Sequence, residues 1–173
     1  MKDKITLIRG DITQQEVEVL VNAANAHLAG GGGVDGAIHH AGGAAIMKEL
    51  KEKYRGCPTG SAVITRAGNL RARYVIHAVG PRWQGGNKGE PTLLASAYRT
   101  SLALAQQYGC QTIAFPSIST GIYGYPVEEG AKIALKTVSQ YLRENPVFTT
   151  VRFILFDEKT LKAYQGAYQY VGA

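Results

Sequence analysis

The stretch from Asn22 to Gly43 constrains the fold most, because it combines four consecutive glycines with two asparagines and an acid, Asp35, at the expected start of a helix. Glycine weakens helices and strands and offers no side chain for packing. Such a segment is typical of a loop whose backbone comes close to a ligand, with a few polar side chains directed at it. We therefore predict a phosphate-binding loop that carries a functional carboxylate.

Apolar runs with the spacing of strands alternate along the chain with runs that have helical spacing. Strands are predicted at 4–9, 17–21, 61–65, 74–79, 112–115 and 151–156. Helices are predicted from residue 34 with an interruption at 42–43, from Pro91 to a stop at Gly109, from Pro126, and from Asp157. The strands at 61–65 and 74–79 are joined by a short turn, which predicts an antiparallel pair. The sequence thus predicts an α/β fold, a three-layer α/β/α sandwich with a mixed central sheet, as a single domain over residues 1–173.

The composition is that of a globular protein, with 45% hydrophobic and 18% charged residues. The two cysteines are far apart in sequence, no secretory signal is visible, and no apolar run approaches the roughly 20 residues needed to span a bilayer. We therefore expect a cytoplasmic protein with reduced cysteines and no membrane contact.

The formal net charge of +6 is concentrated between Lys53 and Val127, where eight basic residues face a single acid, Glu90. Such a block could steer a phosphate-bearing ligand to a site or contact nucleic acid. It could equally be a solvated basic surface. Charge alone leaves both interpretations open.

Four polar features are predicted to follow strand ends: Asp11, the loop from Asn22 to Gly36, the loop from Ser117 to Gly124, and the pair Phe156 and Asp157. In open α/β sheets, ligands bind beyond the carboxyl ends of the strands. Both glycine loops lead into helices, so each can present backbone N–H groups and a positive dipole end to an anion. Two such loops side by side would suit a diphosphate.

A dinucleotide-binding site is an alternative, because Gly31, Gly33 and Gly36 satisfy the GxGxxG pattern. That fingerprint requires the glycines directly after a strand and an acid about 20 residues further on. Here a polar loop separates the strand from Gly31, and no such acid is evident. The sequence therefore disfavours this interpretation.

The motifs together are more specific than either glycine loop. They are Gly10-Asp-Ile-Thr13, Val21-Asn-Ala-Ala-Asn25, Gly30-Gly-Gly-Gly-Val-Asp-Gly-Ala-Ile-His39 and Ser119-Thr-Gly-Ile-Tyr-Gly-Tyr-Pro126. In order and spacing they resemble the macrodomain family, and within it the MacroD-type branch, which includes bacterial O-acetyl-ADP-ribose deacetylases. The resemblance implies a single macrodomain that binds ADP-ribose and hydrolyses it from O-acetyl-ADP-ribose and from modified Asp or Glu side chains. The implied partners are ADP-ribose, its esters and mono-ADP-ribosylated proteins.

The resemblance also implies residue roles. Asp11 would accept a hydrogen bond from adenine, and Phe156 would stack on the adenine ring. Asn25 would hold hydroxyls of the distal ribose, and Asp35 would orient or deprotonate a water molecule. The residues from Ser119 to Gly124, which include Thr120, Gly121 and Ile122, would wrap the diphosphate. Tyr123 would cover the distal ribose and help confine the water. Further ligand contacts are implied for Ile12, Gly32, Gly33 and Val34.

Each of these roles has a plainer alternative. Asp11 could cap the turn into Thr13, Phe156 could be a core residue, and Asp35 could be a favourable acid at a helix start. Asn22 is interpreted as a turn residue.

The four histidines are expected to be structural. His39 and His40 are adjacent, so on a helix they point in different directions. His27 and His77 have no acidic or thiol partner at metal-ligand spacing. We predict no metal and no cofactor.

Asp35 has no second acid in its loop, whereas glycoside hydrolysis usually uses two carboxylates. A lone base suffices where the leaving group departs without protonation, as a carboxylate with a pKa of about 4 does. We therefore expect hydrolysis of ADP-ribose esters, with arginine-linked and serine-linked forms resisted. A non-catalytic ADP-ribose-binding reader and an RNA-contacting regulatory protein, with weak RNA contact through the basic block, are the alternatives.

Overall fold

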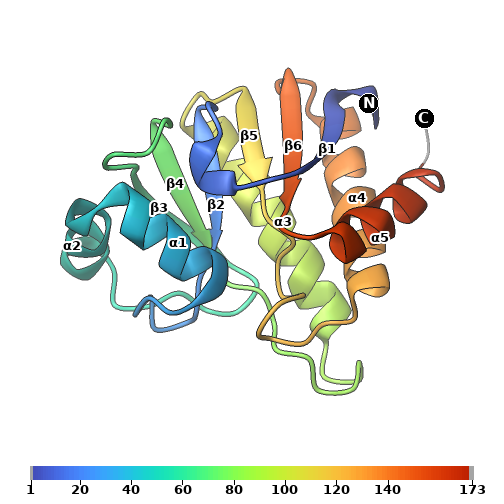
Figure 1. The fold of residues 1–173 in the computed structure, drawn as a ribbon, viewed down its shortest axis with the longest axis horizontal. Coiled ribbons are helices and arrows are strands. Elements are labelled where there is room, and N and C mark those ends of the chain that lie inside the picture. The colour runs from blue at the N-terminus through green and yellow to red at the C-terminus, as the bar shows by residue number, and fades with distance from the viewer. Residues whose placement is uncertain (1, 172–173) are drawn as a thin grey trace.

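A six-stranded sheet forms the centre of the computed structural model, which describes residues 2–171 (Figure 1). The strand order is β1-β6-β5-β2-β4-β3. All neighbouring strands are parallel except β3 and β4, which are antiparallel. The predicted mixed sheet and antiparallel pair are confirmed. The strands are β1 (Ile5–Arg9), β2 (Val19–Ala23), β3 (Ala62–Arg66), β4 (Tyr74–Ala78), β5 (Thr112–Phe115) and β6 (Thr150–Leu155).

Helices cover both faces of this sheet (Figure 1). One apolar core joins a face of the sheet to α3 (Glu90–Gln107), α4 (Val127–Glu144) and α5 (Glu158–Tyr168). A second core joins the other face to α1 (Gly33–Gly42), α2 (Ala44–Lys53) and the short 3₁₀ helix η2 (Ile12–Gln14). A further 3₁₀ helix, η1 (Lys2–Lys4), precedes β1. The predicted three-layer α/β/α sandwich is confirmed.

Local sequence accounts for most of these elements. In α4 the buried residues Ala131, Ala134, Val138 and Tyr141 recur at helical spacing, so one stripe of the helix faces the core. Strand β2 is buried on both faces, as its apolar run indicates for a strand inside a parallel sheet. Its predicted bounds were two residues too early.

Asn22 is therefore not a turn residue, as the sequence suggested, but lies inside β2 and is fully buried. The register sets it directly beside His77 of β4, with which it shares a hydrogen bond. This polar pairing across two strands gives the buried Asn22 Nδ2 a partner, whereas Asn22 Oδ1 is buried without a hydrogen-bond partner among the described residues.

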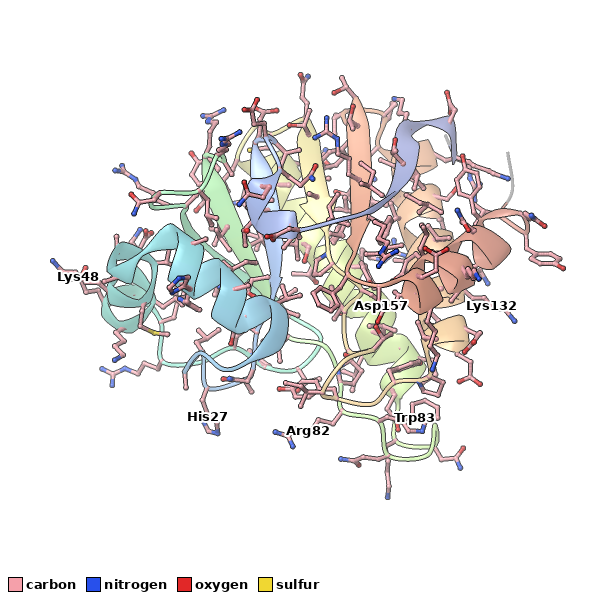
Figure 2. The ribbon with its side chains drawn as sticks, viewed as in Figure 1. His27, Lys48, Arg82, Trp83, Lys132 and Asp157 are labelled. Atoms are coloured by element: carbon pink, nitrogen blue, oxygen red, sulfur yellow. The ribbon has the colours of Figure 1, made fainter. Side chains whose placement is uncertain are left out.

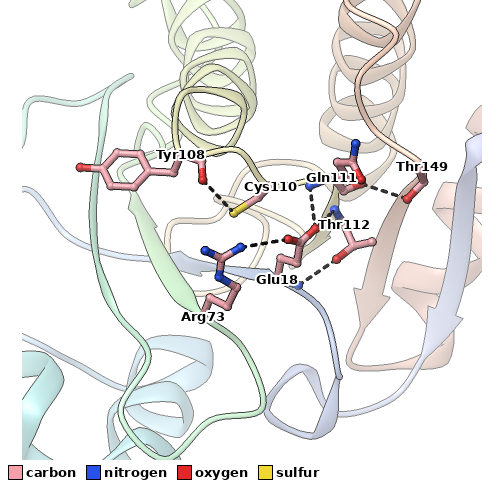
Figure 3. A network of polar contacts seen from close by, with 7 residues as sticks. All are labelled: Glu18, Arg73, Tyr108, Cys110, Gln111, Thr112 and Thr149. Carbon is pink, nitrogen blue, oxygen red and sulfur yellow. Dashed lines mark hydrogen bonds and ion pairs between the residues drawn. The ribbon is translucent and has the colours of Figure 1, made fainter.

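Strands β2 and β5 are held together at their amino ends and share only two residue pairs. Oε1 of Glu18, just before β2, accepts hydrogen bonds from the backbone N–H groups of Gln111 and Thr112 at 2.8 and 3.2 Å (Figure 3). The Thr112 hydroxyl in turn accepts from the Glu18 N–H at 2.8 Å, and Arg73 pairs with the second carboxylate oxygen. The Gln111 N–H contributes most to lowering the pKa of Glu18. These contacts join β2 and β5 at their amino ends. Toward their carboxyl ends the two strands are not paired with each other.

The chain leaves β2 toward α1 on one face of the sheet and leaves β5 toward α4 on the other. A point where neighbouring strands send their connections to opposite faces is where open α/β sheets bind ligands. The topology therefore places a ligand site beyond the carboxyl ends of β2 and β5. Within residues 2–171, no helix is both long and apolar enough to cross a bilayer.

Candidate active site

The predicted functional residues all follow carboxyl ends of parallel strands, so the fold gathers them at one edge of the sheet. Asp11 follows β1, and Phe156 follows β6. Asn25 lies in the first loop, residues 24–32, which connects β2 to α1. Ser119 to Tyr123 lie in the second loop, residues 116–126, which connects β5 to α4.

Asp35 is the best-defined polar group at this edge. It is in the first turn of α1, and only 6% of its surface is exposed. Its Oδ1 accepts a hydrogen bond from Asn22 Nδ2 at 2.8 Å and lies 3.3 Å from His39 Nε2. Its Oδ2 lies 3.5 Å from the position that a Cβ on Gly31 would take, and Asn25 Nδ2 lies 3.9 Å from the same point. One carboxylate oxygen is thus fixed inside the protein, while the other is directed at the first loop together with the Asn25 amide.

A chain of buried hydrogen bonds continues behind Asp35. Asn22 Nδ2 lies 3.1 Å from His77 Nδ1, and His77 Nε2 lies 3.0 Å from the Thr65 hydroxyl, which donates to the Arg66 carbonyl at 2.9 Å. The Thr65 hydroxyl therefore accepts from Nε2, and Nδ1 accepts from Asn22. Burial is the main reason that the pKa of His77 falls to about 4, and nearby His39 lowers it further, so His77 is neutral at pH 7. The neutral ring fixes which way the Asn22 amide points.

Asn25 closes the first loop with its own amide. Its Nδ2 donates to the Gly30 carbonyl at 2.9 Å, and its Oδ1 accepts from the Ala29 N–H at 3.1 Å. The loop also packs tightly on α1, because a Cβ on Gly36 would lie 2.6 Å from the Gly31 carbonyl oxygen. Only glycine fits there. Asn25 retains one N–H and one lone pair for a ligand.

The backbone at the start of α1 completes the first loop. Gly32 is the N-cap and makes no side-chain cap hydrogen bond, and Gly33 has a positive φ of 57°. Val34 is half-buried in the same turn. The free N–H groups of this helix start are suited to an anion.

The second loop is held from below by buried tyrosines of α3 and α5. The Tyr98 hydroxyl accepts from the Ile118 N–H at 2.9 Å, and the Tyr164 hydroxyl donates to Ser117 Oγ at 2.9 Å. Ser117 Oγ and the Thr120 hydroxyl lie 2.6 Å apart. Burial raises the pKa of Tyr164 to about 12 and that of Tyr98 well above its usual range, so both hydroxyls stay protonated. The loop is thus shaped by the protein before any ligand arrives.

The exposed part of the second loop differs from its anchored part. Ser119 has a positive φ of 70°, and its hydroxyl is buried without a protein partner among the described residues. That hydroxyl packs against Gly80, where any side chain would collide with it. A Cβ added to Gly121 would have no heavy atom within 4 Å, and Ile122 is 82% exposed. Ser119 is buried and its carbonyl accepts from the Tyr125 N–H at 3.0 Å, so residues 121–122 form the accessible surface of the loop.

The two loops meet at Gly32, where a Cβ would lie 3.8 Å from Ile122 Cδ1.

At the other end of the edge, Asp11 Oδ1 accepts from the Thr13 N–H at 2.9 Å and the Thr13 hydroxyl at 2.7 Å, so the capping role is present. The second oxygen of Asp11 has no such bond in the described structure. The side chain of Ile12 is buried in the core.

Phe156 is 83% exposed, so its alternative as a core residue is wrong. Its exposed ring, directly after β6, is accessible for stacking on a ligand at this end of the sheet. His77 is a satisfied structural histidine, as expected. The expectation was wrong for His27, which is exposed at the loop edge (Figure 2).

Sequence reasoning missed Asn22 and His39 as partners of Asp35, and His77 as the partner of Asn22. A signal was present for two of them: Asn22 and His77 are polar residues inside otherwise apolar buried strands. Such a residue needs a partner, and buried partners across strands are frequently other polar residues.

Two surface hollows of about 210 and 360 Å³ lie elsewhere, beside β3, and Glu49 and Arg66 line both. Glu49 already accepts from Lys53 and from the Arg66 N–H, so its oxygens are occupied. These hollows reach Thr65 and Arg66 at the far end of the chain behind Asp35, but they include no residue of the two loops and none of Asp11, Asp35 and Phe156. Across residues 2–171, no three His, Cys, Asp or Glu side chains gather closely enough to hold a metal ion.

Comparison with known proteins gives concordant matches. The Macro domain family model matches residues 21–134. The macro domain-containing protein TTE0995 of Caldanaerobacter subterraneus is 62% identical over 172 residues, covering 98% of each chain. The O-acetyl-ADP-ribose deacetylase of Enterobacter cloacae is 52% identical over 168 residues, covering 95% of this chain and 93% of that one. The Trypanosoma brucei macrodomain in complex with ADP-ribose has a TM-score of 0.89 at 38% identity, covering 94% of this chain and 68% of that one.

Proposed function

This chain belongs to the macrodomain family, and on that premise we propose that it binds ADP-ribose at the carboxyl edge of its sheet and hydrolyses ADP-ribose esters. The single observation that carries the proposal is the convergence of Asp35 Oδ2 and Asn25 Nδ2 on one point beside Gly31. A reader that only binds ADP-ribose has little need for a buried carboxylate with one oxygen fixed and the other directed at the ligand loop.

The binding part of the proposal assigns one portion of the ligand to each feature of the edge. Adenine stacks on exposed Phe156 and donates to Asp11. The diphosphate lies between the second loop and the start of α1, where backbone N–H groups stabilise its charge. The distal ribose then reaches Asn25 and Asp35, beneath Tyr123. Binding of ADP-ribose by a relative of the same fold supports this arrangement.

The reaction part assigns two roles to the first loop. Asp35 Oδ2 accepts a hydrogen bond from the attacking water and takes its proton as the new C–O bond forms. Asn25 Nδ2 donates to a hydroxyl of the distal ribose and holds the ester beside that water. If water attacks the anomeric carbon, the bond from that carbon to the ester oxygen breaks, and the acid leaves as a carboxylate, which needs no proton from the protein. If water attacks the acyl carbon, the acyl C–O bond breaks, and the ribose oxygen leaves as a hydroxyl by taking back the proton that Asp35 holds. The name of the Enterobacter cloacae relative supports the acetyl ester as one substrate. Removal of mono-ADP-ribose from Asp or Glu side chains extends the same chemistry to a protein ester.

The proposal restricts the substrates to esters. His39 Nε2 is directed at Asp35 Oδ1, and Asp11 is engaged with Thr13, so neither is placed to protonate a poor leaving group. Serine-linked and arginine-linked ADP-ribose, whose leaving groups need a proton, should therefore be resistant.

The test is a substrate panel run in oxygen-18 water. O-acetyl-ADP-ribose and a peptide with ADP-ribosyl-glutamate should both be hydrolysed, and peptides with serine-linked or arginine-linked ADP-ribose should not. The label in the released acid reports attack at the acyl carbon, and the label in ADP-ribose reports attack at the anomeric carbon. Efficient release of ADP-ribose from serine would contradict the single-carboxylate mechanism. If the protein bound ADP-ribose but hydrolysed none of the substrates, its function would be that of a non-catalytic ADP-ribose reader.

A second candidate function is weak RNA contact through the basic block between Lys53 and Val127. The fold reduces the support for it, because Lys53, Arg71 and Arg73 pair with acids from outside the block, Glu49, Glu16 and Glu18. A cytoplasmic location and a single-domain organisation remain predictions from the sequence.

A further inference from the structure

Arg82 is an exposed cation at the loop edge, four residues after the end of β4. In Figure 2 it lies between His27 and Trp83, with its side chain reaching outward. Its guanidinium carbon lies 4.9 Å from the centroid of the Tyr123 ring. Among the ion pairs of residues 2–171 it has none, whereas Arg71 and Arg73 of the same basic block each have a glutamate partner. Arg82 is thus free to pair with a carboxylate of another molecule.

The loop that carries Arg82, residues 80–89, is fixed rather than loose. The buried Glu90 carboxylate accepts hydrogen bonds from the N–H groups of Gln84, Gly86 and Lys88 at 2.8, 3.0 and 2.6 Å. The Trp83 N–H donates to the Tyr123 carbonyl at 2.9 Å, and its ring packs on that of Tyr125 at 4.8 Å. A cation held in place in this way loses little conformational entropy when it binds.

The position of Arg82 relates it to the leaving side of the substrate. Asp35 Oδ2 lies beside Gly31, and at the next residue, Gly32, a Cβ would lie 3.8 Å from Ile122 Cδ1. Ile122 is followed by Tyr123, on whose ring Arg82 lies. These contacts run outward from the proposed reaction point to the surface. In the proposed binding mode, the group esterified to the distal ribose extends from the reaction point toward this rim, formed by Ile122, Tyr123 and Arg82.

We propose that Arg82 binds carboxylates of the carrier peptide beside the modified residue, so that the protein prefers ADP-ribose esters in acidic segments. This inference rests on the proposed ester hydrolase function and adds the class of protein substrate. A guanidinium pairs with carboxylates in a bidentate manner, and the Tyr123 ring beneath it holds its plane. The Arg82 guanidinium would therefore recognise an Asp or Glu side chain of the peptide, next to the residue that carries ADP-ribose.

The test compares two peptides with a central ADP-ribosyl-glutamate, one flanked by Asp and Glu and the other by Asn and Gln. The wild-type protein should favour the acidic peptide about two- to fivefold in kcat/KM at low salt, through KM, as expected for an exposed ion pair. The preference should shrink as salt rises. In Arg82→Gln the ratio should fall to one, and in Arg82→Glu it should reverse.

Lys48→Gln is the matched control, because it removes one positive charge from exposed α2, away from the rim (Figure 2). It should keep the wild-type ratio. Hydrolysis of O-acetyl-ADP-ribose reports that each variant is folded and competent. If wild type hydrolyses no ester, the proposed function fails. If it hydrolyses both peptides equally, or Arg82→Gln keeps the preference, only this inference is overturned. Weaker binding of free ADP-ribose by Arg82→Gln would also overturn it, since Arg82 would then contact the nucleotide.

Discussion

At Gly121 a Cβ would meet no protein heavy atom within 4 Å, yet the residue lies on the loop assigned to the diphosphate. We predict that Gly121→Glu leaves the melting temperature unchanged and abolishes ADP-ribose binding, because the added carboxylate occupies the diphosphate position and repels it. Calorimetric titration with ADP-ribose measures the effect. Gly166→Glu is the control, since Gly166 of α5 is equally open and belongs to neither loop. If Gly121→Glu bound ADP-ribose as tightly as wild type, the assignment of the diphosphate to this loop would be wrong.

Asn22 orients Asp35 from within the sheet. We predict that Asn22→Ala lowers the free energy of unfolding by about 1–3 kcal/mol, because it leaves buried Asp35 Oδ1 and His77 Nδ1 without their shared donor. Urea denaturation measures the loss. In an Asp35→Ala background the same change should cost less, since the carboxylate that needs the donor is gone. Equal losses in the two backgrounds would mean that Asn22 and Asp35 do not act together.

Among the structural elements, the loop at residues 80–89 depends on one buried acid. Burial raises the pKa of Glu90, but the backbone N–H groups of Glu90 itself, Gln84, Gly86 and Lys88 outweigh it and lower the pKa from 4.5 to about 2. The unfolded chain therefore binds this proton more readily than the folded one. The stability that Glu90 contributes is complete above about pH 4.5 and is lost as the pH falls through about 2.

We predict that Glu90→Gln melts at a lower temperature than wild type at pH 7, because an amide cannot replace a carboxylate that accepts three N–H groups. The gap between the two should narrow as the pH falls below 4.5. Thermal denaturation followed by circular dichroism at pH 7 and pH 3 measures it. Glu144→Gln, on the exposed end of α4, should melt like wild type. If the difference in melting temperature between wild type and Glu90→Gln were the same at both pH values, the ionised Glu90 carboxylate would not be what holds the loop.

The elements also show what the sequence could predict. Strands, helices and the antiparallel pair followed from apolar spacing and from glycine and proline positions, because these are local signals. The bounds of β2 did not, because the buried Asn22 side chain finds its partners, His77 and Asp35, on other elements of the fold. The role of Glu90 was also hidden, since its three partners depend on how the loop wraps back. Asp35 and Asn25 were selected by motif, but the network behind Asp35 required the register of the sheet.

For the whole molecule, the net charge of +6 overstates the positive surface available to RNA. Three of the eight basic residues in the central block are paired with acids from elsewhere. We predict that a single-stranded RNA binds weakly. The slope of log affinity against log salt concentration should be no steeper than about −3.5, which is about −0.7 for each of the five remaining basic residues. Fluorescence anisotropy across a salt series measures the slope. A steeper slope would indicate phosphate contacts outside the block. The five remaining basic residues are Arg55, Arg66, Arg82, Lys88 and Arg99.

The central claim is that Asp35 takes the proton of the water molecule that attacks an ADP-ribose ester, bound by the two loops at the carboxyl ends of the strands. The most direct measurement is the single-turnover rate on a peptide with ADP-ribosyl-glutamate, for wild type, Asp35→Asn and Asp35→Ala, together with the affinity of each for ADP-ribose. Asp35→Asn keeps the shape of the side chain and an oxygen acceptor for Asn22. The rate should fall about 10²- to 10⁴-fold in both variants, while the affinity stays within the same order of magnitude. Normal turnover by Asp35→Asn would contradict the account.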